Sequence, residues 1–397
     1  MAKIWQKDNI KLNSLVEAYT IGNDPELDLE LISYDCMASI AHAKMLGKIG
    51  ILSQTEVAKL KTGLHKIIKL SEQGKFKIKK GDEDGHTAIE NFLTEHYGLV
   101  GKKIHTGRSR NDQVLVAVRL CSLDKTEKIV RGTQQLIKKI NQQVDKYNST
   151  IMPGYTHTQR AMPSTVGMWL GSFSAALADD LELLQAARKI IDQNPLGSVT
   201  GFGEDIFGLD REYTTKEMGF KKTQKNPMYC AMSRGKFENI ILMALSQIMF
   251  DLGKLANDLV WFTTKEFNFF DLPTEFKTGS SAMPQKRNFD LLELIRGNTS
   301  IFLGYQFQVQ EVVKNLFSGY NRDMQLTKEP YLRGIKLAIT TIEIMDLAIS
   351  NLKVNKENLK LACTDEIYAT QKAYQLVKKG TPFRDAYRKV GKQINPN

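Results

Sequence analysis

Residues 273–290 read PTEFKTGSSAMPQKRNFD and combine small hydroxyl residues with positive charge. Ser280 and Ser281 follow a glycine, which suits a mobile loop whose backbone can approach a ligand. Lys286 supplies a cation, and Asn288 can orient a carboxylate by hydrogen bonds. A predicted helix begins directly afterwards, so its N-terminus adds attraction for an anion. An exposed polar linker between two helices is the alternative interpretation.

A second segment, MPGYTHTQRAMP at residues 152–163, places His157 between two threonines. Histidine can act as a general acid or base near neutral pH. Arg160 follows three residues later. A histidine that is satisfied within a turn is the alternative, and for a lone histidine it is the commoner outcome.

A third segment, KIHTGRSRNDQ at residues 103–113, alternates Arg108 and Arg110 with Ser109 ahead of a predicted helix. This dense set of donors is matched to a carboxylate or a phosphate. A solvated charged turn in which Asp112 caps the helix fits the same residues equally well.

Three other polar segments are less specific, and for residues 193–208 pure turn geometry is as good an interpretation as a ligand role. Residues 320–330 read YNRDMQLTKEP, and residues 193–208 contain a turn followed by a helix start. Residues 82–84 are consecutive acids followed by His86, but such runs usually mark a solvated turn. We therefore expect no metal site there.

These segments are breaks between long predicted helices. Apolar residues recur at three- and four-residue spacing in segments 29–46, 114–147, 164–191, 230–262, 291–315 and 331–352. Strand-like alternation is scarce, and Phe76–Lys79 is one short candidate for a hairpin or an extended arm. The pattern predicts an all-α fold built on a long central helical bundle.

We expect the bundle to lie between two smaller helical domains. One boundary is predicted near Gly107 and the other near Leu361. The expected division is an N-terminal domain at 1–106, a bundle at 107–361 and a short C-terminal domain at 362–397.

Composition excludes several classes of protein. The 397 residues are 42% hydrophobic and 25% charged, which is not the composition of a disordered chain. The four cysteines form no CxxC pair, so we expect neither a zinc site nor a disulfide framework. Reduced thiols in a cytoplasmic protein are the expected state. Residues 1–9 do not read as a secretory signal, and the apolar run Ile240–Phe250 is too short to span a membrane. The net charge of +11 fits an anionic partner without identifying it.

The motifs together resemble the argininosuccinate lyase family, within the fumarase/aspartase superfamily. Residues 279–288, GSSAMPQKRN, are similar to the superfamily signature, and residues 105–113 to the motif particular to argininosuccinate lyases. Residues 154–161, 194–198 and 320–328 agree in order. Phe289 stands where the family usually has proline, the family's usual N-terminal opening is missing, and relatives usually continue beyond Asn397.

The resemblance implies reversible elimination of argininosuccinate to arginine and fumarate. It makes Ser280 the base on a mobile loop and pairs His157 with Glu293 as the acid side. Lys286, with Asn288, would stabilise the carbanion. The resemblance also implies substrate contacts from Ser109, Arg110, Asn111, Thr156, Ser281, Asn288, Tyr320, Gln325 and Lys328.

The resemblance further implies a homotetramer with a helical core and active sites shared between chains, with no cofactor or metal. Another lyase of the superfamily and a non-catalytic, crystallin-like relative are the alternatives. Nucleic-acid binding would rest on net charge alone, so neither a nucleic acid nor a membrane is expected as a partner.

Overall fold

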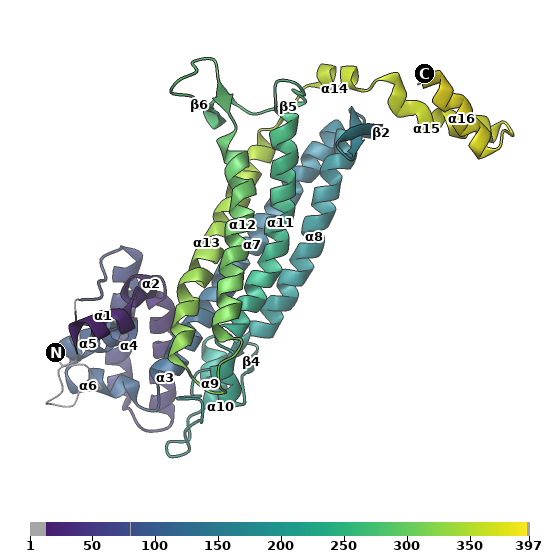
Figure 1. The fold of residues 1–397 in the computed structure, drawn as a ribbon. Helices are drawn as coiled ribbons and strands as arrows, with labels where there is room; N and C mark the ends of the chain where they lie inside the picture. The colour runs from purple at the N-terminus through teal and green to yellow at the C-terminus, as the bar shows by residue number, and fades with distance from the viewer. Residues whose placement is uncertain (1–12, 80, 395–397) are drawn as a thin grey trace. The chain divides into compact units, whose positions relative to one another are not determined.

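The computed structural model describes residues 13–79 and 81–394, and these are mostly helical (Figure 1). The expectation about residues 1–9 therefore lies outside the described residues. The first part of the chain forms short and medium helices: α1 (Ser14–Ile21), α2 (Asp24–Asp28), α3 (Ile32–Lys48), α4 (Gln54–Glu72), α5 (Gly85–Tyr97), α6 (Leu99–Lys102) and the 3-10 turn η1 (Lys103–His105). The all-α prediction is confirmed.

The long helices follow the apolar periodicity of the sequence closely. They are α7 (Arg110–Tyr147), α8 (Val166–Ile191), α11 (Lys236–Phe262), α12 (Asp290–Val313) and α13 (Lys328–Ser350). The predicted helix at 230–262 is divided, because α10 (Pro227–Met232) ends just before Gly235, whose φ of 77° is left-handed.

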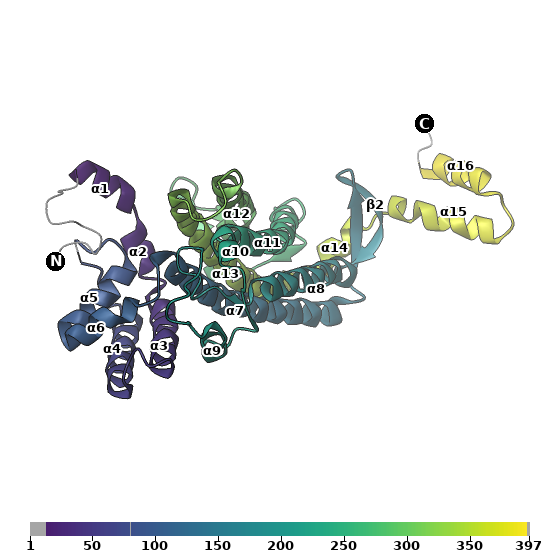
Figure 2. The ribbon, with the colours of Figure 1, turned by 90° about the horizontal axis from the view of Figure 1, so that it is seen from below.

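The remaining helical elements are shorter. They are α9 (Arg211–Glu217), η2 (Thr274–Phe276), η3 (Arg322–Thr327), α14 (Lys356–Ala362), η4 (Asp365–Tyr368), α15 (Ala369–Lys378) and α16 (Phe383–Ile394). Figure 2 shows α15 and α16 side by side, packed through Ala373, Ala386 and Val390.

Short two-stranded ribbons occur where the sequence analysis placed breaks between helices. The longest pairs β1 (Ile151–Thr156) with β2 (Gln159–Thr165) in antiparallel fashion. The others pair β3 (Gln193–Asn194) with β4 (Lys222–Thr223), β5 (Phe270–Asp271) with β8 (Lys353–Val354), and β6 (Thr278–Gly279) with β7 (Arg287–Asn288). Residues 76–79 form no strand, so of the two forms proposed for them the hairpin is wrong.

The chain forms two compact units. Unit 1 contains residues 1–128, 183–245 and 303–336, and unit 2 contains residues 129–182, 246–302 and 337–397. Each of the long helices contributes a segment to both units. The domain boundaries near Gly107 and Leu361 remain a prediction.

Unit 1 has an apolar core built largely from α3, α4 and α5. It includes Ile32, Leu46, Leu60, Leu64 and Leu93, none more than 1% exposed. Because these side chains recur at helical spacing, each helix presents one apolar face to the others. This core positions α3, which carries Asp35, and α5, which carries His86.

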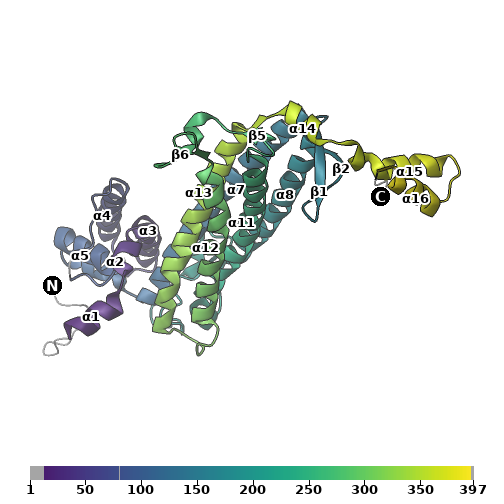
Figure 3. The same cartoon turned by 45° about the horizontal axis from the view of Figure 1, so that its top comes forward.

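In unit 2, segments of the five long helices lie side by side (Figure 3). A Cβ on Gly253 of α11 would lie 2.5 Å from the side chain of Thr299 on α12, so these helices require glycine to approach this closely. Ser174 donates a hydrogen bond to Asn141 at 2.7 Å, which joins α8 to α7.

Among the described residues, α11 alone is long and apolar enough to cross a membrane, but 61% of its apolar window is buried inside the protein. The core helix of a folded protein has the same length, apolar content and burial.

The loop after β3 is held by one buried carboxylate. Asp112 is fully buried, and its Oδ2 accepts hydrogen bonds from the backbone N–H groups of Gly197 at 2.9 Å and Val199 at 3.0 Å. Val199 has a φ of 54°, which a β-branched residue adopts only with strain. The bonds to Asp112 help to keep this strained conformation in place.

We predict that Val199→Gly stabilises the protein, because glycine adopts a left-handed φ without steric cost. The expected gain is about 1 kcal/mol in the free energy of unfolding, measured by chemical denaturation. Val199→Ala is the matched control, since alanine keeps the Cβ and should give no gain. Equal stability of the two variants would contradict the strain at this position.

Candidate functional site

A pocket in unit 1 is lined by side chains of both charges. Five residues expected to contact substrate line it: Arg110, Asn111, Tyr320, Gln325 and Lys328. Acidic residues and further arginines line the same pocket. The structure therefore brings these predicted residues together from the start of α7 and from the segment around η3.

The start of α7 aims the first of these residues. Ser109 is the residue before the helix, and its Oγ accepts from the backbone N–H of Asn111 at 3.3 Å. In return, Asp112 Oδ1 accepts from the N–H of Ser109 at 2.9 Å. These reciprocal bonds satisfy free N–H groups at the helix start. Asp112 thus caps the helix as the alternative interpretation proposed, but it is buried rather than solvated.

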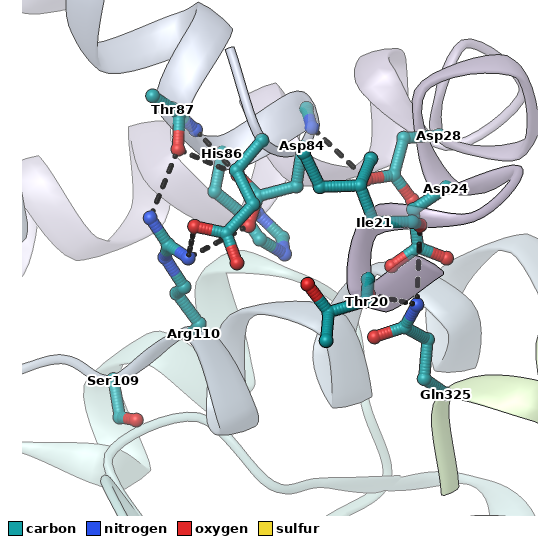
Figure 4. A network of polar contacts seen from close by, with 12 residues as sticks. Thr20, Ile21, Asp24, Asp28, Asp84, His86, Thr87, Ser109, Arg110 and Gln325 are labelled. Carbon is teal, nitrogen blue, oxygen red and sulfur yellow. Dashed lines mark hydrogen bonds and ion pairs between the residues drawn. The ribbon is translucent and has the colours of Figure 1, made fainter. Parts of the chain in front are cut away.

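Arg110 extends from this helix start toward α5 (Figure 4). Its guanidinium lies 2.8 Å from Glu83 and 3.4 Å from Asp84, and it donates to the hydroxyl of Thr87 at 3.1 Å. Burial favours a lower pKa for Arg110, but the nearby charges of Asp84 and Glu83 raise it overall. Arg110 is therefore a fixed cation in the pocket.

Lys328 forms the second charged cluster. Its Nζ lies 2.5 Å from Asp28 and 2.9 Å from Asp24, and its side chain is only 4% exposed. A buried cation of this kind requires such partners, because an unpaired charge away from water is strongly destabilising. Asp28 also accepts from the N–H of Gly85 at 2.9 Å, which ties α2 to the start of α5.

Gln325 and Tyr320 complete the group in unit 1. The amide of Gln325 donates to the carbonyls of Thr20 and Ile21, each at 3.2 Å (Figure 4). The hydroxyl of Tyr320 lies 3.4 Å from the guanidinium of Arg234, which is also 5.7 Å from the tyrosine ring centroid. Both side chains are thereby oriented at the pocket.

The acidic run before His86 was misinterpreted from the sequence. Glu83 and Asp84 are buried and line the pocket, so the solvated-turn interpretation is wrong for them. Asp84 also begins α5, because its Oδ1 accepts from the N–H of Thr87 at 2.8 Å. Tertiary packing, rather than local composition, removes these carboxylates from water.

His86 lines the same pocket and pairs with Asp35 of α3 through its Nδ1. Burial lowers the pKa of His86, but the charge and hydrogen bond of Asp35, with Asp84 and Asp28 nearby, raise it to about 9. His86 is therefore a cation at neutral pH. Asp35 also accepts from the hydroxyl of Ser39 at 3.3 Å, and Ser39 in turn accepts from Arg108 at 2.8 Å.

Sequence reasoning missed several residues of this pocket. The missed polar side chains are those of Asp24, Asp28, Glu83, Asp84, His86, Arg234 and Arg322. They come from four separate parts of the chain, and no local pattern marks Asp24, Asp28 or Arg234 as functional. The available signal was the density of acids in residues 82–84 next to a histidine.

The other predicted residues belong to unit 2. Thr156 and His157 lie at the tip of the β1–β2 hairpin, and both are exposed. His157 has a φ of 51° and the next residue, Thr158, a φ of 61°. Left-handed values at both positions are typical of a tight two-residue hairpin turn, which usually contains asparagine and glycine. The tip therefore presents His157 outward in a strained conformation.

The loop between β6 and β7 carries the serines. Ser280 is partly exposed, and its Oγ accepts from the N–H groups of Ala282 at 3.3 Å and Met283 at 3.1 Å. Ser281 and Lys286 are exposed in the same loop. Donors directed at Oγ favour its negatively charged form over its neutral form.

Asn288 and Glu293 lie where this loop ends. Asn288 is half-buried in β7, and Glu293 is exposed in the first turn of α12. Phe289, the departure from the family pattern, lies with its ring centroid 5.3 Å from the Nζ of Lys277. Within residues 13–79 and 81–394, no hydrogen bond or ion pair joins Glu293 to His157.

We predict that the His86–Asp35 pair stabilises the fold in a pH-dependent way. Because the folded pKa of about 9 exceeds the unfolded value near 6.5, the stabilisation is complete below pH 6.5 and is lost as pH rises through 9. The difference in unfolding free energy between wild type and His86→Gln should fall by a few kcal/mol between pH 6 and pH 9.5, since one pKa unit corresponds to about 1.4 kcal/mol.

The control for this measurement is His96→Gln, an exposed histidine on the same helix, α5. Its difference from wild type should stay constant over that range. A constant difference for His86→Gln as well would contradict the protonated pair.

Comparison with known proteins supports the resemblance found in the sequence. Residues 9–304 match a family described as lyase. The chain is 44% identical to an argininosuccinate lyase from Thermotoga neapolitana over 98% of both chains. It is 40% identical to one from Bacteroides fragilis, covering 99% of this chain and 87% of that one.

Solved structures show the same fold at low identity. A variant of EDDS lyase with bound fumarate has a TM-score of 0.81 at 23% identity, covering 97% of this chain and 76% of the other. A class II fumarase from Schistosoma mansoni has a TM-score of 0.78 at 16% identity, covering 94% and 91%. The helical architecture is therefore the one seen in these lyases. From the full-length identities and the matched segment, the chain belongs to the argininosuccinate lyase family, among the lyases of the fumarase/aspartase group.

Proposed function

We propose that this protein catalyses the reversible elimination of argininosuccinate to L-arginine and fumarate, the last step in making arginine. The observation that carries the proposal is the 44% identity to an argininosuccinate lyase across 98% of both chains. The reaction needs no cofactor in this proposal, because a substrate carboxylate can delocalise the charge that deprotonation creates.

The pocket of unit 1 has the chemistry that this substrate requires. Argininosuccinate carries carboxylates together with an amino group and a guanidinium, so its site needs charges of both signs. Arg110 and Asn111, with Ser109 at the same helix start, bind the carboxylates of the fumarate part in this proposal. Thr156 of unit 2 contributes to the same group, supplied by another chain of the assembled protein. Tyr320, Gln325 and Lys328 hold the arginine part.

The loop of residues 279–288 supplies the base. Ser280 removes the proton beside a carboxylate, and the N–H groups of Ala282 and Met283 stabilise the charged oxygen that this role requires. Lys286, with Ser281 and Asn288, stabilises the negative charge that develops on the substrate carboxylate. The exposure of Lys286 and Ser281 is consistent with a loop that closes over substrate.

His157, oriented by Glu293, protonates the departing nitrogen directly or through water. A carboxylate partner would fix the histidine tautomer and favour its charged form. Because both side chains are exposed and unpaired with each other within the described chain, we assign their pairing to the assembled protein.

We further propose a cytoplasmic homotetramer whose active sites take segments from different chains. Large apolar side chains are exposed along α8, α11 and α12, including Met168, Phe250, Trp261, Leu294 and Phe307, each more than half exposed. An apolar surface of this kind is typical of a helical interface between copies of a chain.

The direct test is release of fumarate from argininosuccinate, followed by ultraviolet absorbance. The wild-type protein should release fumarate, and Ser280→Ala should lower turnover by about 10²–10⁴-fold without loss of helical content, the range expected for loss of a general base. Release from aspartate or adenylosuccinate instead would indicate another lyase of the superfamily. No release from any of these substrates would support a non-catalytic relative.

Sharing of sites between chains is tested by mixing two inactive variants. His157→Asn chains and Ser280→Ala chains are dissociated, combined and reassembled. If each site takes these residues from different chains, some mixed sites will be intact and activity will return. Mass spectrometry provides the control for subunit exchange, and exchange without recovered activity would contradict the shared-site arrangement.

A further inference from the structure

We propose that Arg160 is a positioning residue that holds the strained turn bearing His157 by clamping the hairpin to the segment between α14 and η4. This inference rests on the proposed function, in which His157 is the acid. It concerns a residue of unit 2 that the proposed chemistry leaves without a role.

The turn at residues 157 and 158 needs contacts from outside the hairpin, because its residue types disfavour its left-handed backbone conformation. Both His157 and Thr158 adopt left-handed φ values, and Thr158 is β-branched. Strained positions of this kind persist only where the surrounding structure over-determines them. An isolated two-stranded hairpin is itself only marginally stable in water.

The required support begins one residue pair behind the turn. Thr156 pairs with Gln159, and the next cross-strand pair is Tyr155 with Arg160. The ring of Tyr155 packs on that of Phe267 with centroids 5.8 Å apart and on that of Phe262 at 6.2 Å. One strand is therefore held by aromatic packing against the end of α11 and the residues after it.

Arg160 holds the other strand. Its Nη1 donates to the carbonyl of Ala362 at 3.2 Å and to the hydroxyl of Thr364 at 3.1 Å. Thr364 in turn donates to Glu366 at 2.9 Å, and the Nε of Arg160 lies 3.7 Å from the same carboxylate. Since ion pairs in water contribute little, the two charge-assisted hydrogen bonds are the stronger part of the attachment that Arg160 makes.

The contacts of Tyr155 and Arg160 restrain the turn that carries His157. Tyr155 packs on Phe262 and Phe267, and Arg160 donates to Ala362 and Thr364, so both strands are attached to unit 2 directly behind the turn. These attachments restrain the geometry of the turn. A shift of about 1 Å at a catalytic group can lower turnover on the order of 100-fold. Loss of the clamp should therefore affect catalysis more than substrate binding.

The experiment compares Arg160→Ala and Arg160→Lys with Lys372→Ala. Lys372 forms an ion pair with Asp365, the residue after Thr364, so this control disturbs the neighbouring turn and removes none of the bonds that Arg160 makes. Arg160→Ala should lower kcat by about 10–100-fold while KM changes less than about threefold, and the pH profile of kcat should shift. Arg160→Lys should recover part of the loss, and Lys372→Ala should match wild type.

Hydrogen exchange of residues 151–165, followed by mass spectrometry, is the readout that does not depend on activity. Exchange there should be faster in Arg160→Ala, with the rest of the chain unchanged. Unchanged exchange would overturn the clamp, and so would a loss of kcat with an unaltered pH profile. If wild type released no fumarate, the proposed function would fail while the exchange result still decided the clamp.

Discussion

The buried carboxylate of Asp112 is the constraint on which the arrangement of unit 1 depends. One of its oxygens accepts from Ser109 at the start of α7, and the other accepts from Gly197 and Val199 of the loop after β3. Burial raises the pKa of Asp112 to about 6, against the effect of these three N–H donors. The same side chain therefore sets the direction of Arg110 and Asn111 and holds a strained loop in place.

Charge pairing is the second feature that organises the pocket. Arg110 is paired with Glu83 and Asp84, and Lys328 with Asp24 and Asp28. Each buried charge would be costly alone, so the pairs keep the pocket charged without unfolding it. A substrate with carboxylates and a guanidinium offers partners of the same kinds. Unit 2 is different, because its predicted catalytic side chains lie on an exposed hairpin tip and an exposed loop.

The long helices could be predicted closely, because burying one face of a helix requires apolar residues at three- and four-residue spacing. The β1–β2 hairpin could not, because its turn contains His157 and Thr158 instead of the asparagine and glycine that signal such turns. Arg110, Asn111, Tyr320, Gln325 and Lys328 were predicted from the motifs and lie at one pocket. Glu83 and Asp84 of that pocket were missed, because the run at 82–84 reads locally as a solvated turn, and Asp24 and Asp28 were missed because no motif contains them.

By itself the sequence determined the helical class, the positions of the long helices and the motifs of the lyase family, since all of these depend on local spacing of residue types. Tertiary structure alone decided which carboxylates pair with Arg110 and Lys328, why His86 carries a charge, and how the turn at His157 is held. Those properties depend on burial and on contacts between residues as far apart as Asp28 and Lys328, which no local pattern encodes.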